Sequence, residues 1–276
     1  MSFDLQRDAL SRALITAHRG VTGGNIPGNT LAAFDAALLQ GADMIELDVS
    51  NSIDGELFVF HPGMEPVFLH MEDKLLSDIS AEEIHKLRFL NSGATPTQFG
   101  IDTFDEDLEH LKGRCYINVD KFWNNVDLIV KAIRRHNMMD QILVKTGPNE
   151  DVYRYLEENA PDVNYMAILR GHDDQTEKLL KRGLHYVGAE VLFDTENSEF
   201  ATNAYVERMH KAGLLVWVNA IVYNHKAVLT AGHNDDISVV GRMDEGWGWL
   251  LDKGYDIIQT DWPMMLKQYI SQRNAR

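Results

Sequence analysis

The chain has 276 residues, of which 45% are hydrophobic and 25% charged, a balance typical of a folded globular protein and not of a disordered or fibrous one. Its formal net charge of −16 disfavours nucleic acid as a partner, because no basic stripe opposes the acidic field. The single cysteine, Cys115, excludes an internal disulfide and a cysteine zinc cluster and favours the reducing cytosol.

Short apolar runs of strand type alternate with helical patterns along the whole chain. These runs predict strands at residues 14–18, 44–49, 115–120, 141–145, 164–169, 186–191, 214–219 and 256–260. Gly41, Gly183, Gly213 and Gly254 each stand between a helical pattern and a strand, where a left-handed helix cap belongs. Eight βα units close a parallel barrel, so we predict an α/β fold, the TIM (β/α)8 barrel, as a single domain over residues 1–276.

A doubly wound open sheet uses the same alternation, but no G-x-G-x-x-G motif follows the first predicted strand. Capping boxes that begin at Ser80 and Thr103 predict two helix starts between the second and third barrel strands. The first of these helices does not fit the alternation of one strand and one helix that a barrel requires. We therefore expect an inserted excursion at about residues 62–101 that packs over one end of the barrel. A second long connection, at about 220–245, stays unassigned.

Three acids fall where barrel strands place their side chains inside. Glu46 and Asp48 are two residues apart on one strand and share a face, and Asp120 ends the next barrel strand. Converging carboxylates repel one another unless a cation holds them ionised, and oxygen-only ligands favour Mg²⁺ or Ca²⁺. Alternatively, the first two are solvated edge-strand acids and Asp120 is a helix N-cap.

Two histidines stand at strand ends, His18 after the first strand and His61 after the run 56–60. Asp54-Gly55 predicts a hairpin that returns His61 to the barrel mouth. Because imidazole titrates near neutral pH, the pair suits the base and the acid that cleavage of a phosphodiester requires. A lone histidine is more often a surface or packing residue, and this alternative stays open.

Positive charge to bind a phosphate is available next to the predicted site, from Arg19 beside His18 and Lys121 beside Asp120. An ordinary surface salt bridge is the alternative for each. Lys145, at another strand end, is a weaker candidate of the same kind.

Several segments together resemble the glycerophosphodiester phosphodiesterase family: Ala17-His18-Arg19-Gly20, residues 27–34, residues 41–49, Asp54-Gly55, His61, residues 117–121, 217–219 and 254–263. The resemblance implies a TIM barrel, one divalent cation, and hydrolysis of glycerophosphodiesters to glycerol 3-phosphate and an alcohol. By matching motif, Glu46, Asp48 and Asp120 would bind the metal, His18 and His61 would be the acid/base pair, and Arg19 and Lys121 would hold phosphate. In the family, a substrate hydroxyl attacks first and gives a cyclic phosphate that water opens.

Three positions depart from the family pattern: Gly28 stands in place of the usual Glu, Pro62 in place of an acid, and Asp120 in place of Glu. We expect these departures to change which substrate is accepted, and not to abolish activity. One alternative is a lysophospholipase D-like enzyme that stops at the cyclic phosphate, with Phe58, Phe60, Phe68, Trp247 and Trp249 along an apolar tail groove. The other is a barrel that binds a phosphorylated ligand without turnover.

No apolar stretch reaches the roughly 20 residues of a membrane span, and the first residues lack the order of a signal peptide. We therefore expect a cytoplasmic protein without stable membrane insertion, whose partner is a small-molecule glycerophosphodiester. The sequence leaves a homo-oligomer open.

Overall fold

The structure, a computed structural model, describes residues 3–275. Its strands in this range are β1 (Leu14–His18), β2 (Met44–Asn51), β3 (Leu57–Val59), β4 (Tyr116–Asp120), β5 (Ile142–Thr146), β6 (Asn164–Arg170), β7 (Tyr186–Leu192), β8 (Leu215–Asn219) and β9 (Ile257–Thr260). All but β3 pair in parallel, and β1 pairs with both β2 and β9, which closes the barrel. The predicted TIM barrel is confirmed, and each predicted strand ends within about two residues of the observed one.

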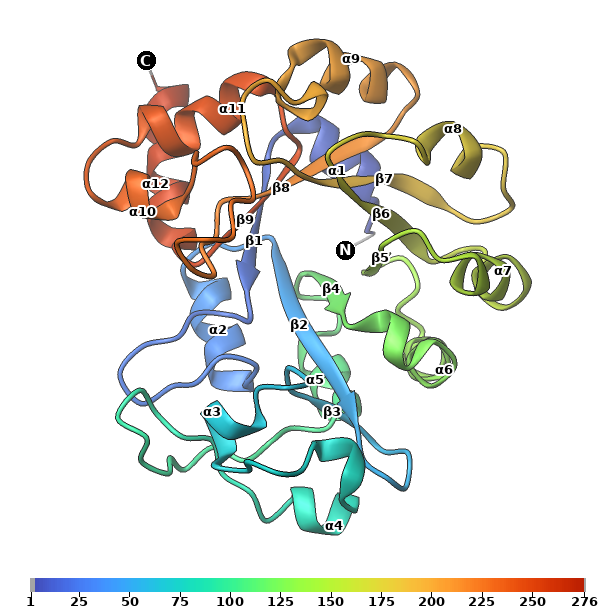
Figure 1. Ribbon diagram of the computed structural model, residues 1–276, viewed down its shortest axis with the longest axis vertical. Helices are drawn as coiled ribbons and strands as arrows, with labels where there is room; N and C mark the ends of the chain where they lie inside the picture. The colour runs from blue at the N-terminus through green and yellow to red at the C-terminus, as the bar shows by residue number, and fades with distance from the viewer. Residues whose placement is uncertain (1–2, 276) are drawn as a thin grey trace.

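Most of the helices lie around the barrel in chain order (Figure 1). They are α1 (Leu5–Ser11), α2 (Leu31–Leu39), α3 (Glu65–Leu69), α4 (Ala81–Ile84), α5 (Phe104–Leu111), α6 (Val126–His136), α7 (Glu150–Asn159), α8 (Thr176–Leu179), α9 (Asn203–Lys211), α10 (Asp235–Val239), α11 (Trp249–Lys253) and α12 (Pro263–Asn274). Short helical turns are η1 (Leu76–Asp78), η2 (Phe122–Asn124), η3 (Glu199–Ala201) and η4 (Asp244–Gly248). Among these residues no helix is long and apolar enough to cross a membrane.

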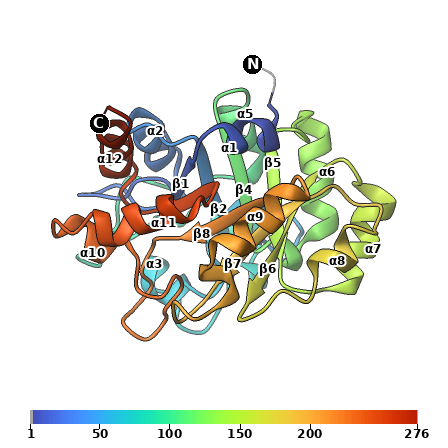
Figure 2. The same cartoon turned by 90° about the horizontal axis from the view of Figure 1, so that it is seen from above.

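Apolar side chains fill the barrel at the amino ends of its strands. Leu14, Met44 and Tyr116 belong to this inner layer, together with Leu143 and Trp217, and all are buried. Helix α1 packs Leu5 and Ala9 against the same layer and covers this end of the barrel. Figure 2 shows α1 and α3 on opposite sides of the strands. The carboxyl ends of the strands are therefore left to carry the polar side chains.

The chain between β3 and α5 makes a small core of its own. Phe58 and Phe60 pack there with buried residues of α3, η1 and α4, such as Leu69, Leu76 and Ile84. Ser80 forms the capping box predicted for it: its side chain accepts from the N–H of Glu83, whose carboxylate accepts from the Ser80 N–H. In Figure 1 this segment extends beyond the barrel past the end of β2.

The glycine predictions are correct at three positions and wrong at one. Gly41, Gly213 and Gly254 have φ of 90°, 73° and 82°, which is the left-handed region that glycine adopts without strain. Gly183 does not have a positive φ. Helix α8 already ends at Leu179, so Gly183 lies in the turn beyond it and does not cap the helix.

Candidate functional site

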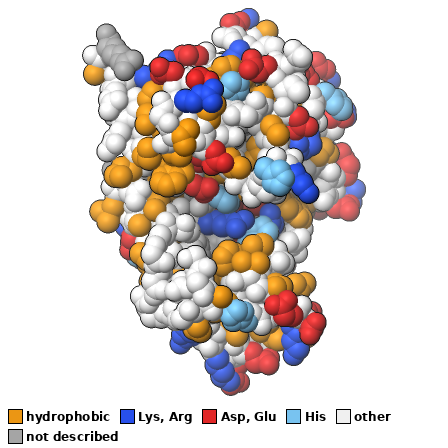
Figure 3. Space-filling model, turned by 60° about the vertical axis from the view of Figure 1, so that its left-hand side comes forward, with side chains coloured by type: hydrophobic (Ala, Val, Ile, Leu, Met, Phe, Trp, Pro, Cys, Tyr) orange, Lys and Arg blue, Asp and Glu red, His pale blue; other side chains and the backbone are white. Residues whose placement is uncertain are grey.

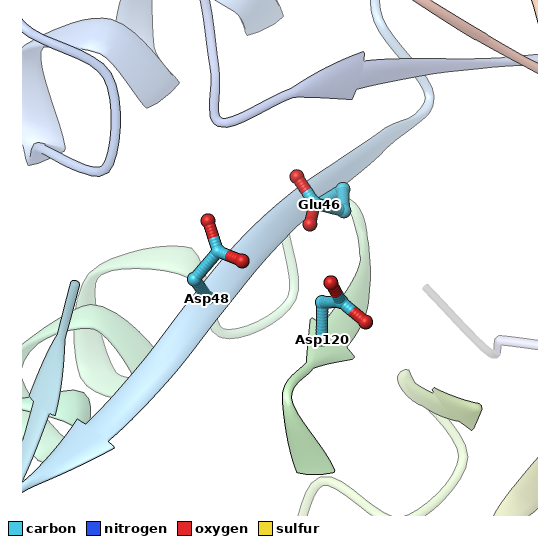
Figure 4. Close-up of side chains that lie close together, drawn as sticks. All are labelled: Glu46, Asp48 and Asp120. Atoms are coloured by element: carbon cyan, nitrogen blue, oxygen red, sulfur yellow. The ribbon is translucent and has the colours of Figure 1, made fainter. Parts of the chain in front are cut away.

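Strands β2 and β4 bring three carboxylates together at the barrel mouth (Figure 4). Glu46 and Asp48 alternate with buried apolar residues on β2, and Asp48 is the register partner of Asp120 on β4. One carboxylate oxygen from each lies within 4.8 Å of the others. Because Glu46 and Asp48 are 3% and 0% exposed, the alternative of solvated edge-strand acids is wrong for them.

The carboxylate cluster fits a divalent cation. Asp48 Oδ2 is held by Asn29 Nδ2 at 2.9 Å and Arg19 Nε at 2.8 Å. Asp48 Oδ1 is buried and finds no hydrogen-bond partner within residues 3–275, so its lone pairs are free to bind a cation. Burial and the charge of Asp48 raise the pKa of Glu46 to about 7. A hard cation such as Mg²⁺ or Ca²⁺ would supply the missing charge.

Lys121 reaches Asp120 through an unusual backbone conformation. On a regular strand, adjacent side chains point to opposite faces. Lys121 instead has φ 57° just after β4, and its Nζ lies 2.9 Å from Asp120 Oδ2. Burial would raise the pKa of Asp120, but the positive charges of Lys121 and Lys145 outweigh it and lower this pKa. Asp120 is therefore an ionised partner of Lys121, and Lys121 itself, not Asp120, stands at the N-cap of η2.

Arg19 also follows its strand in the left-handed region, with φ 55°. Its backbone N–H donates to Glu46 Oε2 at 3.0 Å while its guanidinium pairs with Asp48. Gly28 packs closely against Arg19, where an added Cβ would lie 3.1 Å from the Arg19 Cβ. A larger residue at position 28 would require Arg19 or Thr22 to shift by a few tenths of an ångström.

His18 is oriented by a residue distant in sequence. Its Nδ1 lies 2.9 Å from Asp261 Oδ1, and the backbone N–H of Asp261 donates to the buried carboxylate of Asp235. Burial alone would lower the pKa of His18, but the hydrogen bond to Asp261 and the negative charge of Glu46 raise it. The 220–245 connection therefore contributes Asp235, which fixes the backbone that carries Asp261.

His61 reaches the same mouth from the predicted hairpin. Strand β3 runs antiparallel to β2, and Gly55 in the turn has φ 88°. The ring of His61 places Nδ1 2.9 Å from the Pro62 carbonyl oxygen and Nε2 3.8 Å from Asp48 Oδ1. Burial, together with the nearby charges of Arg19 and Lys121, lowers the pKa of His61.

A second polar group is formed by residues of β5, β7 and β8. Lys145 on β5 is 3% exposed, pairs with Glu190 Oε2 at 2.6 Å, and lies 3.7 Å above the Trp217 ring. Asn219 donates to Glu190 Oε1 and accepts from Trp217 Nε1. The charge of Lys145 is one of those that lower the pKa of Asp120.

Sequence reasoning missed Asn29, Glu190, Tyr223 and Asp261. Asn29 and Asp261 lie inside segments that carry the family resemblance, so membership of those segments could have identified them as candidates. Tyr223 is 57% exposed and stands edge-on to His18, with ring centroids 5.9 Å apart. Its place in a loop after β8 gave no sequence signal.

A cavity of about 1030 Å³ begins at His18, Arg19 and His61 and continues along the loop 21–29, the segment 60–94 and residues 261–265. Of the aromatic residues predicted for a tail groove, Phe60 and Phe68 line this cavity. The prediction is wrong for the other three. Phe58 and Trp247 are fully buried in the cores, and Trp249 stacks on His233 at 3.9 Å between ring centroids.

The fold and this geometry define a TIM barrel with an acidic, histidine-flanked site at the carboxyl ends of its strands. The chain is similar to a glycerophosphodiester phosphodiesterase of Caldanaerobacter subterraneus subsp. tengcongensis, 30% identical over 143 residues, which are 49% of this chain and 58% of that protein. The solved structure of a glycerophosphoryl diester phosphodiesterase from Parabacteroides distasonis matches with TM-score 0.76 and 17% identity, over 99% of this chain and 94% of that one. An Oleispira antarctica phosphodiesterase, solved with the product sn-glycerol-3-phosphate, matches with TM-score 0.68 and 20% identity, over 95% of this chain and 99% of that one.

The curated relatives confirm the resemblance to glycerophosphodiester phosphodiesterases that the sequence predicted. The chain covers less than two thirds of the length of the curated relatives it matches, 58% of one and 29% of another. The two solved structures, at 17% and 20% identity, support the fold. A family model described as a domain of unknown function matches residues 165–270, which include β7, β8 and β9.

Proposed function

We propose that this protein is a metal-dependent phosphoric diester hydrolase that converts glycerophosphodiesters to glycerol 3-phosphate and an alcohol. The observation that carries the proposal is the buried cluster of Glu46, Asp48 and Asp120, with an unpartnered oxygen on Asp48, between two oriented histidines. The similarity to curated phosphodiesterases supports it. The cytosolic location expected from the single thiol stays a prediction.

Glu46, Asp48 and Asp120 would hold the divalent cation, Mg²⁺ or Ca²⁺. When bound, such an ion stabilises negative charge on phosphate oxygens as a Lewis acid. Arg19 and Lys121 would add positive charge on the same phosphate, since each lies against one of the three acids. The cation and these two side chains together would offset the net negative field of the protein at this point.

The two histidines differ in what their Nδ1 atoms contact, and the difference suggests a division of roles. The carboxylate of Asp261 stabilises a charged His18 ring, so His18 Nε2 would donate a proton to the departing alkoxide. The Pro62 carbonyl can only accept, so His61 Nδ1 carries a hydrogen and Nε2 of the neutral ring is free to act as the base. The opposite directions of their pKa shifts agree with this division.

In the first step a substrate hydroxyl would attack phosphorus. Its proton passes to His61 as the bond between phosphorus and the alcohol oxygen breaks, and His18 protonates that oxygen. Water would then open the cyclic phosphate with the two roles exchanged. Phosphorus NMR of the products separates complete hydrolysis from an enzyme that stops at the cyclic ester.

The test is glycerol 3-phosphate release from glycerophosphoethanolamine, glycerophosphocholine and glycerophosphoglycerol. EDTA should stop the release and added Mg²⁺ or Ca²⁺ should restore it. His18→Ala and His61→Ala should each lower kcat about 100- to 10,000-fold with a smaller change in KM. His172→Ala, an exposed histidine outside the site, is the matched control. Activity that survives both substitutions, or that persists in EDTA, would contradict the proposal.

A protein that binds a phosphorylated ligand without turnover is the alternative that Gly28 and Pro62 motivate. Calorimetry with glycerophosphocholine would then show binding while the diester stays intact. The orientation of both histidines by polar partners favours the enzyme instead.

A further inference from the structure

The polar group formed by β5, β7 and β8 begins beside the carboxylate cluster. Val119 on β4 and Val144 on β5 are register partners, so the next residues on these two strands, Asp120 and Lys145, lie side by side. Neighbours at the same level of adjacent parallel strands point to the same face of the sheet. Lys145 is 3% exposed, and its side chain therefore shares the barrel interior with Asp120.

Glu190 extends this group to the strand that lies opposite β2. In the closed strand order, β7 is four strands from β2 in either direction, and Glu190 lies on β7. Its register partner is Trp217, which packs in the apolar layer inside the barrel, so Glu190 also faces the interior. Loss of solvent around the Tyr223 hydroxyl and the negative charges of Glu190 and Glu46 raise the pKa of Tyr223. Glu190 and the acids therefore border one mouth.

Glu190 and Trp217 together have the composition of a binding site for an organic cation. The face of an aromatic ring and a carboxylate both attract positive charge, and quaternary ammonium ligands bind over such rings. Here the chain supplies the cation itself, since Lys145 Nζ lies 3.7 Å from the centre of the Trp217 ring and 2.6 Å from Glu190 Oε2. Asn219 Nδ2 donates to Glu190 Oε1. The cation site is therefore already filled by Lys145.

Burial keeps Lys145 in this place. Lys145, Glu190 and Trp217 are 3%, 7% and 0% exposed, and separation of a buried ion pair leaves an uncompensated charge, which is strongly unfavourable. A cationic alcohol that approached the group would meet the ammonium of Lys145 without a free anion to neutralise it. On the face drawn in Figure 3, basic and histidine side chains lie in a hollow with hydrophobic side chains on either side. Positive charge from a ligand would be repelled there as well.

The direction of the proposed reaction brings the leaving alcohol to this group. In phosphoryl transfer the attacking and leaving oxygens stand roughly in line on opposite sides of phosphorus. The attacking hydroxyl gives its proton to His61, which enters the mouth from the hairpin paired with β2. His18, the proposed acid for the leaving oxygen, stands edge-on to Tyr223. The leaving alcohol is therefore directed away from β2, to the side where β7 carries Glu190.

We propose that Lys145 is a specificity-determining residue that excludes cationic alcohols, so that the alcohol half of the diester is an uncharged polyol such as glycerol or inositol. The inference rests on the proposed function, because it takes the phosphate to lie at the carboxylate cluster. Each oxygen of Glu190 keeps a second lone pair, and the ammonium of Lys145 has three hydrogens to donate. These groups match the hydroxyls of a polyol, which is both donor and acceptor.

The first test compares alcohols of different charge with the wild-type protein loaded with Mg²⁺. The ratio kcat/KM is measured for glycerophosphoglycerol, glycerophosphoinositol, glycerophosphocholine and glycerophosphoethanolamine. We expect the two uncharged alcohols to be preferred by at least about tenfold, since an uncompensated like charge a few ångströms away costs at least this factor. Equal values for the four diesters, or a preference for choline, would overturn the inference and leave the proposed hydrolysis intact.

The second test removes the internal cation. Lys145→Ala opens the place over Trp217 and leaves Glu190 for an external cation, for which tetramethylammonium chloride is the probe. Calorimetry should show no binding to the wild-type protein and millimolar binding to Lys145→Ala, with sodium chloride at the same ionic strength as reference. The kcat/KM of glycerophosphocholine relative to glycerophosphoglycerol should rise roughly 10- to 30-fold in Lys145→Ala. Adding Glu190→Gln removes the carboxylate and should abolish this gain.

Lys131→Ala is the matched control, because it removes a lysine from an exposed ion pair outside the site. It should change neither tetramethylammonium binding nor the substrate ratio. A Lys145→Ala variant that is folded by circular dichroism but binds no tetramethylammonium would overturn the inference, and the wild-type ratios decide it even where this variant does not fold. Binding of tetramethylammonium to Lys145→Ala without hydrolysis of any diester would instead refute the proposed function and support the assignment of Lys145.

Discussion

Replacing Asp261 by Asn tests whether this carboxylate prepares His18 for catalysis. The side chains lie 2.9 Å apart, and the His18 side chain is 12% exposed while that of Asp261 is 45% exposed. A hydrogen bond between charged groups contributes about 1.5 to 3 kcal/mol, and exposure of Asp261 to solvent places this one at the lower end. A loss of about 1.4 kcal/mol corresponds to a factor of ten. We therefore expect kcat to fall at least tenfold in Asp261→Asn, with little change in KM.

The pH dependence gives a readout that a merely structural role would not move. The charged ring of His18, whose pKa is raised, is present below that pKa, so activity is lost as pH rises through it. Asp261→Asn removes the negative charge and lowers this pKa, and the alkaline limb of the kcat profile should move down by about one pH unit. Asp194→Asn, an exposed acid paired only with exposed Arg170, is the matched control. An unchanged profile in Asp261→Asn would refute the role.

Three further perturbations test other parts of the structure. The pKa of Glu46 is raised to about 7, so protons compete with the cation for this carboxylate. The Kd for Mg²⁺, measured by calorimetry, should therefore increase about tenfold for each pH unit below about 7. Glu46→Gln should remove most of the affinity for Mg²⁺, and a Kd that does not change with pH would contradict this reasoning. Glu190→Gln leaves the buried Lys145 ammonium without its carboxylate and should lower the free energy of unfolding, measured in urea, by about 3 to 5 kcal/mol. Adding Lys145→Met should restore part of that stability. A loss below about 1 kcal/mol would show that the ion pair is not needed for stability. Asp107 is fully buried, neither of its carboxylate oxygens is hydrogen-bonded within the described chain, and burial raises its pKa well above 3.8. Above pH 3.8 the folded state therefore binds more protons than the unfolded state, so the free energy of unfolding falls as pH rises. Asp107→Asn should raise the free energy of unfolding by about 1 to 3 kcal/mol at pH 8 but not at pH 4.

The strands and the three acids could be predicted from sequence because their signals are local. Alternation of polar and apolar residues places Glu46 and Asp48 on one face whatever the rest of the chain does, and Asp120 is fixed by its place at the end of the next barrel strand. Capping boxes depend on residues three apart, and both predicted boxes form. The candidate carboxylate cluster follows from these patterns together with the predicted barrel, which places β4 beside β2.

The partners of these residues could not be predicted in the same way. Asp261 is 243 residues from His18, and only closure of β9 against β1 brings them together. The contact of Lys121 with Asp120 depends on a left-handed φ at a non-glycine residue, which no residue pattern indicates. The aromatic prediction failed at Trp247 because burial of its ring, and its hydrogen bond to Asp235, are tertiary outcomes.

The two phosphate-binding candidates, Arg19 and Lys121, are both held with positive φ, which costs a non-glycine residue roughly 1 to 2 kcal/mol. Glycine at either position would relieve that cost and remove the guanidinium or the ammonium at once. Selection for heat resistance alone would therefore not discard these residues, because the loss of Arg19 or Lys121 leaves the carboxylate of Asp48 or Asp120 without its basic partner, and that loss costs more than the backbone gains.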